Sequence, residues 1–452
     1  MARSDDRSTL GGRLQRYAHV GGTAAGLAAR FAAARVSGGF DPKARASDLR
    51  EALGGLKGPV MKMAQILATV PGAVPEEYAA ELAKLQANAP PMGWPFVRRR
   101  MAGELGADWQ SRFAEFSPEA IHAASLGQVH KARLLDGRAV AVKLQYPGMA
   151  SAVDADLDQL DVALKAFRAV DRSVDLAEIK VELGARLREE LDYALEAKHM
   201  ALFAHMLADY PGVSVPKAVA ELSTARLLTM DWLDGRPLMA FKDADQDTRN
   251  RLAVNLFHAW YVPVHQWGVV HGDPHLGNYA ARPDLRLNLL DFGAIRVLPP
   301  RFVYGVVELY RGLLTGDEER TAAAYELWGF KGLTRQLIDV LNIWARFLYR
   351  PLLTDSADSI DEGTMGADEG RVTMQRVHSE VRRLGTVTIP PEFLFLDRSA
   401  IGLGGVFLRL RARVNWHRLF EALIDGFSEN ALAGRQGAAL ASAGLSAGGG
   451  HA

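Results

Sequence analysis

The chain has 452 residues, of which 53 are basic, 53 are acidic and 48% are apolar. This balance produces no global field that favours nucleic acid or an acidic membrane, so we expect no nucleic-acid partner. There is no cysteine, which excludes disulfides, thiolate metal sites and cysteine nucleophiles. The length predicts about two to four structural units.

The amino-terminal segment bears on where the protein acts. The stretch MARSDDRSTL contains acids, which argues against a secretory or mitochondrial signal, so we expect a cytoplasmic protein. No stretch reaches the roughly 18–20 uncharged apolar residues that span a bilayer. Residues 17–36 are rich in Ala and Gly. They form either a helix that packs on another helix, within the chain or in a homodimer, or a peripheral helix on the inner face of the membrane.

Four regions are predicted in chain order. Residues 1–90 are typical of a helical extension, and residues 91–232 of strands around one helical insertion. Residues 233–430 are mainly helical, and residues 431–452 are low in complexity and expected to be disordered. Together these regions predict an α+β chain with two lobes.

The strands of the second region are marked by turns and alternation. Runs rich in β-formers between residues 115 and 147 are joined by Asp136 and Gly137, a strong hairpin signal. After the helical insertion, two further strands are predicted within residues 212–221 and 225–235.

Three side chains in the stretch VVHGDPHLGNYAARPDLRLNLLDFGAI indicate phosphate chemistry. Asn278 follows Asp273 by five residues, and Asp291 follows Asn278 by thirteen. Phosphoryl transfer needs a carboxylate near the attacking hydroxyl and a neutral oxygen ligand for Mg²⁺, which Asp273 and Asn278 supply. Asp291 comes after an apolar run from Leu285 to Leu290, at the end of a short strand predicted near residues 286–291, and supplies the main Mg²⁺ carboxylate. Mg²⁺ is usually held by only one or two protein carboxylates, and substrate phosphates complete its coordination.

Lys143 lies upstream, near the end of an alternating strand pattern from Ala139 to Leu144. It either reaches the α- and β-phosphates as a point charge or is a solubility lysine on an edge strand. A phosphate-binding lysine needs a carboxylate partner on a helix. The candidates lie in one segment: Glu189, Glu190, Asp192 and Glu196. Because Asp is unfavourable inside a helix, Asp192 is the residue for which we expect a functional role.

A glycine-rich phosphate loop is expected between the first two strands, but the chain has Ala123, Ala124 and Ser125 there, followed by Gly127. Backbone N–H groups can cradle phosphates in such a loop, although alanine is stiffer than glycine. Two interpretations remain open. The segment is either a tight turn without nucleotide contact or a stiffened nucleotide loop.

Several stretches together resemble the AarF/UbiB family of atypical kinase-like proteins, which is associated with coenzyme Q biosynthesis. The resemblance covers about residues 15–430 and rests on the following stretches: KGPVMKMAQILA (57–68), AASLGQVHKA (123–132), VAVKLQYPG (140–148), EELDYALEA (189–197), HGDPHLGN (271–278) and LDFG (290–293). The chain departs from the family pattern at Ala64, where the family has glycine, and at Asp231, where it usually has glutamate.

The resemblance implies a protein-kinase-like two-lobed fold in which the N-terminal helical extension packs over the active-site cleft. It implies that Lys62 and Gln65 reach into this cleft, where Lys62 faces Glu190 and Asp192. Glu190 is then also the partner of Lys143. It further implies binding of ATP or ADP with Mg²⁺. The adenine-binding residues are those of the connector TMDWLDG, among them Met230 and Trp232.

The function predicted on this basis is an ATP-binding, Mg²⁺-dependent atypical kinase or ATPase. It would support isoprenoid quinone biosynthesis or membrane lipid handling. Two alternatives remain: a small-molecule phosphotransferase, and a pseudokinase scaffold that binds nucleotide without turnover. Gly272 stands where conventional protein kinases have an arginine, and no A-P-E stretch follows Gly293. A small hydroxyl-bearing acceptor, or water, is therefore favoured over a peptide.

Overall fold

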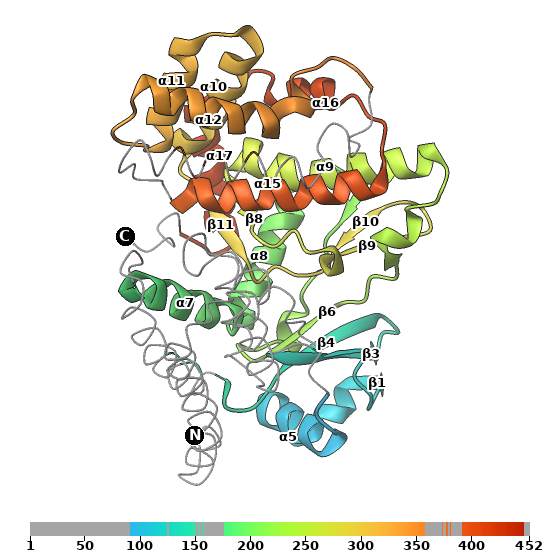
Figure 1. Ribbon diagram of the computed structural model, residues 1–452. Coiled ribbons are helices and arrows are strands. Elements are labelled where there is room, and N and C mark those ends of the chain that lie inside the picture. Colours follow the sequence, from blue (N-terminus) through green and yellow to red (C-terminus); the bar gives the residue numbers. More distant parts are fainter. Residues whose placement is uncertain are drawn as a thin grey trace, which may run out of the picture. The chain divides into compact units, whose positions relative to one another are not determined.

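The computed structural model describes residues 91–123, 126–149, 153, 157, 176–357, 373, 377, 380 and 391–446 (Figure 1). The predictions for the extension at 1–90, including Lys62 and Gln65, and those for Ala124 and Ser125 lie outside these residues. The described chain forms two compact units. The first runs to Glu196 and includes Ala218–Trp232, and the second comprises Ala197–Lys217 and the chain from Leu233 onward. Residues 197–217, predicted in the region 91–232, thus belong to the second unit.

The first unit is built on an antiparallel sheet with strand order β1-β3-β4-β6, and with β2 beside β3. Its elements are α5 (Trp94–Leu105), β1 (Phe113–Phe116), β2 (His122–Ala123), β3 (Gly127–Leu134), β4 (Ala139–Gln145), α7 (Leu176–Glu190), the start of α8 (Tyr193–Met206) and β6 (Leu227–Asp231). The predicted hairpin at Asp136-Gly137 is confirmed between β3 and β4, where Gly137 has a φ of 86°.

The two faces of this sheet have different roles because side chains alternate along each strand. Ala132 and Leu134 of β3 and Val140, Val142 and Leu144 of β4 point to one face and are buried against α5. The opposite face, which we call the Lys143 face, is formed by residues in register across three strands: Val129, Lys131, Ala141, Lys143, Leu228 and Met230. The Lys143 face is also largely apolar, because Ala141, Leu228 and Met230 are buried, and Lys143 projects among these side chains.

The second unit is mixed, with two small sheets and a majority of helix (Figure 1). Its strands are β5 (Val213–Ser214), β7 (Arg236–Pro237), β8 (Val269–His271), β9 (Tyr279–Ala281), β10 (Leu287–Leu289) and β11 (Ile295–Val297). Its helices, after the end of α8, are α9 (Gln246–Trp267), α10 (Pro300–Thr315), α11 (Glu318–Trp328), α12 (Arg335–Tyr349), α15 (Pro391–Leu410), α16 (Trp416–Ile424) and α17 (Glu429–Ser442). The predicted strand near 286–291 is confirmed as β10. The α+β class is also confirmed.

The carboxyl-terminal segment differs from the prediction. Residues 431–442, predicted to be disordered, lie in helix α17, whose buried residues are Leu432, Gln436, Ala439 and Leu440. The Gln436 amide donates to two backbone carbonyl oxygens, those of Gly268 and Leu298, at 3.0 and 2.9 Å. These contacts attach α17 to the end of α9 and to the segment before α10. No described helix is long and apolar enough to cross a membrane.

Gly127 provides a test of the sheet packing. A Cβ atom at this position would overlap the carbonyl oxygen of Leu144 and lie 2.7 Å from the hydroxyl of buried Tyr193. Overpacking of this kind costs about 1–3 kcal/mol, so Gly127→Ala is expected to lower the free energy of unfolding by that amount in urea titrations. Gly103→Ala in α5, where a Cβ meets no atom within 4 Å, is the control and is expected to be stabilising. Equal stability of the two variants would contradict the prediction.

Candidate active site

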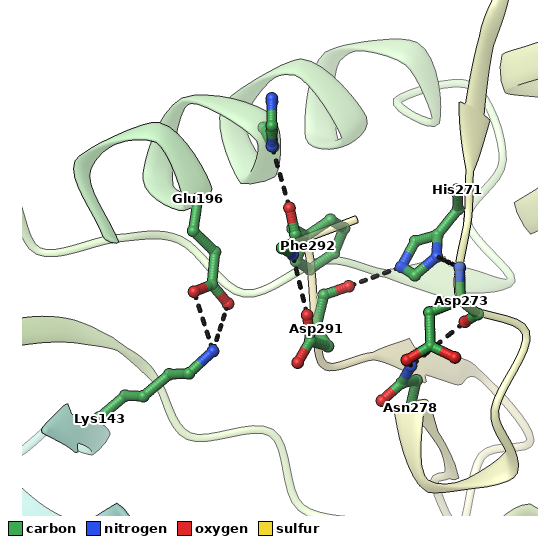
Figure 2. A network of polar contacts seen from close by, with 9 residues as sticks. Lys143, Glu196, His271, Asp273, Asn278, Asp291 and Phe292 are labelled. Carbon is green, nitrogen blue, oxygen red and sulfur yellow. Dashed lines mark hydrogen bonds and ion pairs between the residues drawn. The ribbon is translucent and has the colours of Figure 1, made fainter. Parts of the chain in front are cut away.

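Lys143 lies on β4 and forms a two-point contact with a carboxylate. Its ammonium group donates to both carboxylate oxygens of Glu196, each at 2.8 Å (Figure 2). The Lys143 side chain is 22% exposed and that of Glu196 only 3%. The ammonium also lies 5.0 Å from the ring centre of Tyr193. The pair therefore holds a cation at a fixed, partly buried position on the Lys143 face.

The local fold explains why Glu196 is the residue that reaches Lys143. Helix α7 ends at Glu190 and α8 begins at Tyr193, so the chain is not one continuous helix here. The amide of Gln145, two residues after Lys143, donates to the carbonyl oxygen of Leu191 at 2.9 Å. This bond fixes the junction against β4, and Glu196 follows on the first turn of α8.

Two predictions for this segment need correction. The prediction that Glu190 is the partner of Lys143 is wrong, because the ammonium contacts Glu196. Asp192 does not lie inside a helix: its Oδ1 accepts from the N–H groups of Ala194 and Leu195, both at 3.1 Å. Asp192 therefore caps α8, which is a favourable position for this residue type and by itself explains its presence.

The second unit carries the other polar group, centred on the loop after β8. Asp273 Oδ2 accepts from the side-chain amide of Asn278 at 3.0 Å, and Asp273 Oδ1 accepts from the backbone N–H of His275 at 3.1 Å (Figure 2). The same Asn278 amide donates to the Asp273 carbonyl oxygen at 3.2 Å. The loop thus brings Asp273 and Asn278 together, as the spacing predicts, and leaves the carboxylate partly exposed.

Two short antiparallel ladders bring Asp291 to the same loop. Tyr279 of β9 pairs with Leu289 of β10, and the N–H of Leu290 donates to the carbonyl oxygen of Asn278 at 3.1 Å. Beyond Asp291, β11 pairs with β8 through Ile295 and His271. The register of both ladders therefore places the backbone of Asp291 beside that of Asn278. Buried Tyr279 accepts from Trp260 Nε1 at 2.8 Å, and burial raises the pKa of its phenol well above the usual value.

His271 joins the two ends of this loop. Its Nε2–H donates to the carbonyl oxygen of Asp291 at 2.6 Å, and its Nδ1 accepts from the N–H of Asp273 at 3.3 Å. The ring is buried and lies edge-on to Phe203, with ring centres 5.8 Å apart. The Phe292 ring packs against the rings of both Phe203 and His271. The imidazole thus holds the backbone of both the candidate base and the candidate metal ligand.

The donor set of this loop suits Mg²⁺. Asn278 turns its amide nitrogen toward Asp273, which leaves its carbonyl oxygen for a ligand, and Asp291 supplies a carboxylate. Among the described residues, no group of three or more His, Asp or Glu side chains is arranged to hold a metal. A site with one carboxylate and one amide oxygen matches a hard cation that keeps water and phosphate ligands.

The predicted adenine-binding residues lie at one edge of the Lys143 face. Met230 is buried and pairs with Ala141, two residues before Lys143. The N–H of Trp232 donates to the carbonyl oxygen of Ala139, and the Lys131 ammonium lies 4.4 Å from the Trp232 ring centre. Ala123 ends β2, beside Gln128 of β3. The described part of the chain thus places Met230 on the same sheet as Lys143, and Trp232 directly after the last residue of β6.

Several known proteins are similar to this chain in sequence. A family model of the ABC1 atypical kinase-like domain matches residues 84–325. The chain is 36% identical to the uncharacterized protein sll0005 of Synechocystis, over 64% of this chain and 43% of that protein. It is 30% identical to the mitochondrial atypical kinase COQ8 of Saccharomyces cerevisiae, over 70% of this chain and 65% of that protein. The matched region thus spans less than two thirds of these relatives.

A solved structure is also similar. Rv3197 of Mycobacterium tuberculosis, whose structure was determined as a complex with erythromycin, aligns with a TM-score of 0.60 and 29% sequence identity. The alignment covers 83% of this chain and 94% of that one.

Proposed function

Because the chain belongs to the ABC1 atypical kinase-like family, whose fold is kinase-like, we propose that it binds adenine nucleotide with Mg²⁺ and transfers or hydrolyses the terminal phosphate. The observation that carries this proposal is the hydrogen-bonded loop in which His271 holds the backbone of both Asp273 and Asp291. Fixed placement of a base and a metal ligand is the main contribution that a protein makes to phosphoryl transfer.

Each polar group then has a role. Lys143, held by Glu196, is the point charge that neutralises phosphate oxygens. Asp273 accepts a proton from, or orients, the attacking hydroxyl or water, and its bond from Asn278 keeps the carboxylate in place. Asn278 and Asp291 would hold Mg²⁺, which, when bound, stabilises charge on the phosphates.

We propose a small hydroxyl-bearing molecule or water as the phosphoryl acceptor. After Gly293 the described chain forms β11 at Ile295–Val297 and enters α10 at Pro300. This short connection supports the absence of a peptide-docking loop between the metal loop and α10. The resemblance to AarF/UbiB proteins supports a role in isoprenoid quinone biosynthesis at a membrane surface.

One comparison tests the proposed function. ATP hydrolysis by the wild type is measured with Mg²⁺, with and without liposomes and a phenol that mimics a quinone precursor. Stimulation by lipid and phenol supports the proposal. Phosphate on an added amino alcohol would instead support a small-molecule phosphotransferase. Nucleotide binding without turnover under every condition would support a pseudokinase scaffold.

Gly402 allows a test of how precisely the catalytic loop must be placed. A Cβ atom at this position of α15 would overlap the ring of Pro274, which follows Asp273. Because small displacements of a catalytic group are costly, Gly402→Ala is expected to lower the rate of ATP turnover about tenfold. Gly405→Ala on the same helix, where a Cβ meets no atom within 4 Å, is the control. Equal steady-state rates in the two variants would show that α15 does not position the loop.

A further inference from the structure

A contact from helix α8 holds the peptide group that follows Phe292. The Nδ1–H of His199 donates to the carbonyl oxygen of Phe292 at 2.9 Å. In the same peptide group, the N–H of Gly293 donates to Oδ1 of Asp291 at 2.8 Å. Because a peptide group is planar, its two ends turn together. His199 therefore holds one end of a rigid unit whose other end holds the candidate metal carboxylate.

The residues that precede this peptide group, Asp291 and Phe292, are also fixed by contacts. The carbonyl oxygen of Asp291 accepts from His271 at 2.6 Å. The Phe292 side chain is fully buried and lies 5.4 Å from Phe203 and 6.0 Å from His271 between ring centres. Rotation of the peptide between Phe292 and Gly293 is the motion that His199 directly opposes. Such a rotation would take the Gly293 N–H away from the Asp291 carboxylate.

We infer that His199 is a positioning residue that orients the Asp291 carboxylate for Mg²⁺ through this peptide group. The inference rests on the proposed function, because it concerns how this chain holds the ion. His199 and Phe292 both belong to the second unit, so the contact lies within that unit. Removal of a residue that orients a metal ligand typically lowers metal affinity about 10–100-fold.

The donor atom decides which substitutions preserve the contact. Asn carries its amide nitrogen near the position of the imidazole Nδ1, so His199→Asn keeps a donor. Leu is of similar size and has no donor, so His199→Leu removes the hydrogen bond. Gln carries its amide nitrogen near the position of Nε2, so His199→Gln is expected to resemble Leu. His205→Leu is the matched control, because exposed His205 lies on the same helix and contacts the ring of Trp267.

Calorimetric titration of Mg²⁺ into the full chain saturated with ADP tests the inference without relying on turnover. His199→Leu is expected to raise the half-saturating Mg²⁺ concentration about tenfold. The affinity for ADP without Mg²⁺ is expected to stay unchanged, which a general loss of structure would not allow. His199→Asn and His205→Leu are expected to stay within about threefold of the wild type. If His199→Leu does not fold, His199→Gln provides the same comparison.

Two outcomes would overturn the role of His199. One is equal half-saturation by Mg²⁺ in the wild type and in His199→Leu or His199→Gln. The other is an equal loss in His199→Asn and His199→Leu, because the donor would then not matter. A wild type that binds ADP with no effect of Mg²⁺ would instead refute the proposed function, and the inference with it.

Discussion

Replacing Asp291 by Asn is expected to lower Mg²⁺-dependent ATP turnover by about 10²–10³-fold, the usual cost of removing one group that stabilises developing charge. The substitution removes the carboxylate of the candidate metal site. It retains an oxygen that can accept from the N–H of Gly293, the bond that Asp291 Oδ1 makes at 2.8 Å. The loop is therefore expected to keep its conformation, and the loss to reflect the missing charge. Steady-state hydrolysis at several Mg²⁺ concentrations measures the effect.

Asp284→Asn is the matched control for this prediction. Asp284 lies in the turn between β9 and β10, where it forms an exposed ion pair with Arg286 at 2.8 Å. Exposed pairs of this kind contribute about 0–1 kcal/mol to stability. Asp284 pairs with Arg282 and Arg286 and not with a candidate site residue, so turnover is expected to stay close to that of the wild type. Wild-type turnover in Asp291→Asn, or an equal loss in both variants, would contradict the assignment of Asp291.

The parts of the structure that follow from local chemistry could be predicted from the sequence. The Asp136-Gly137 turn determines a hairpin because Gly137 adopts a positive φ that few other residues tolerate. The contact between Asp273 and Asn278 follows from their spacing within one loop. The positions of Asn278 and Asp291 next to each other could not be predicted in this way, because they depend on the ladder between Tyr279 and Leu289, and the sequence predicts only the strand near residues 286–291.

The sequence does not identify the partner of Lys143, because the choice depends on the break between α7 and α8 at residues 191–192. Asp is unfavourable inside a helix and favourable at its start, and Asp192 occupies a helix start that composition does not reveal. Once Asp192 caps a new helix, the next carboxylate on that helix is Glu196. The role of His199 had no sequence signal, because its acceptor is a backbone carbonyl at Phe292, 93 residues away.

The error at the carboxyl terminus has a different physical origin. The composition of residues 431–452 is low in complexity, which is typical of disorder. The spacing of Leu432, Gln436, Ala439 and Leu440 nevertheless places these four residues on one helical face, and this face is the buried one. Periodicity was therefore more informative than composition, and Gln436 completes the contact by satisfying two backbone carbonyls.

Lys143 and Glu196 are expected to act as one unit. Lys143→Met and Glu196→Gln are each expected to lower ATP turnover about 10²-fold, because either change removes the fixed cation or its partner. The pair is partly buried, with bonds of 2.8 Å to both carboxylate oxygens, so loss of one partner leaves the other unsupported. The double variant is then expected to be no slower than the slower single variant, since residues that act as a unit are not additive.

A second double-mutant cycle, with Glu190 in place of Glu196, distinguishes the two candidate partners of Lys143. Glu190 ends α7, whereas Glu196 lies on α8 and contacts the ammonium. The effects of Lys143→Met and Glu190→Gln are therefore expected to multiply, so that their logarithms add. Measurement of kcat for all variants at saturating Mg²⁺ gives both coupling energies. Additivity between Lys143 and Glu196, together with coupling between Lys143 and Glu190, would show that Glu190 is the functional partner during turnover. Coupling confined to Lys143 and Glu196 is expected because only a carboxylate in contact with the ammonium loses its function when that charge is removed.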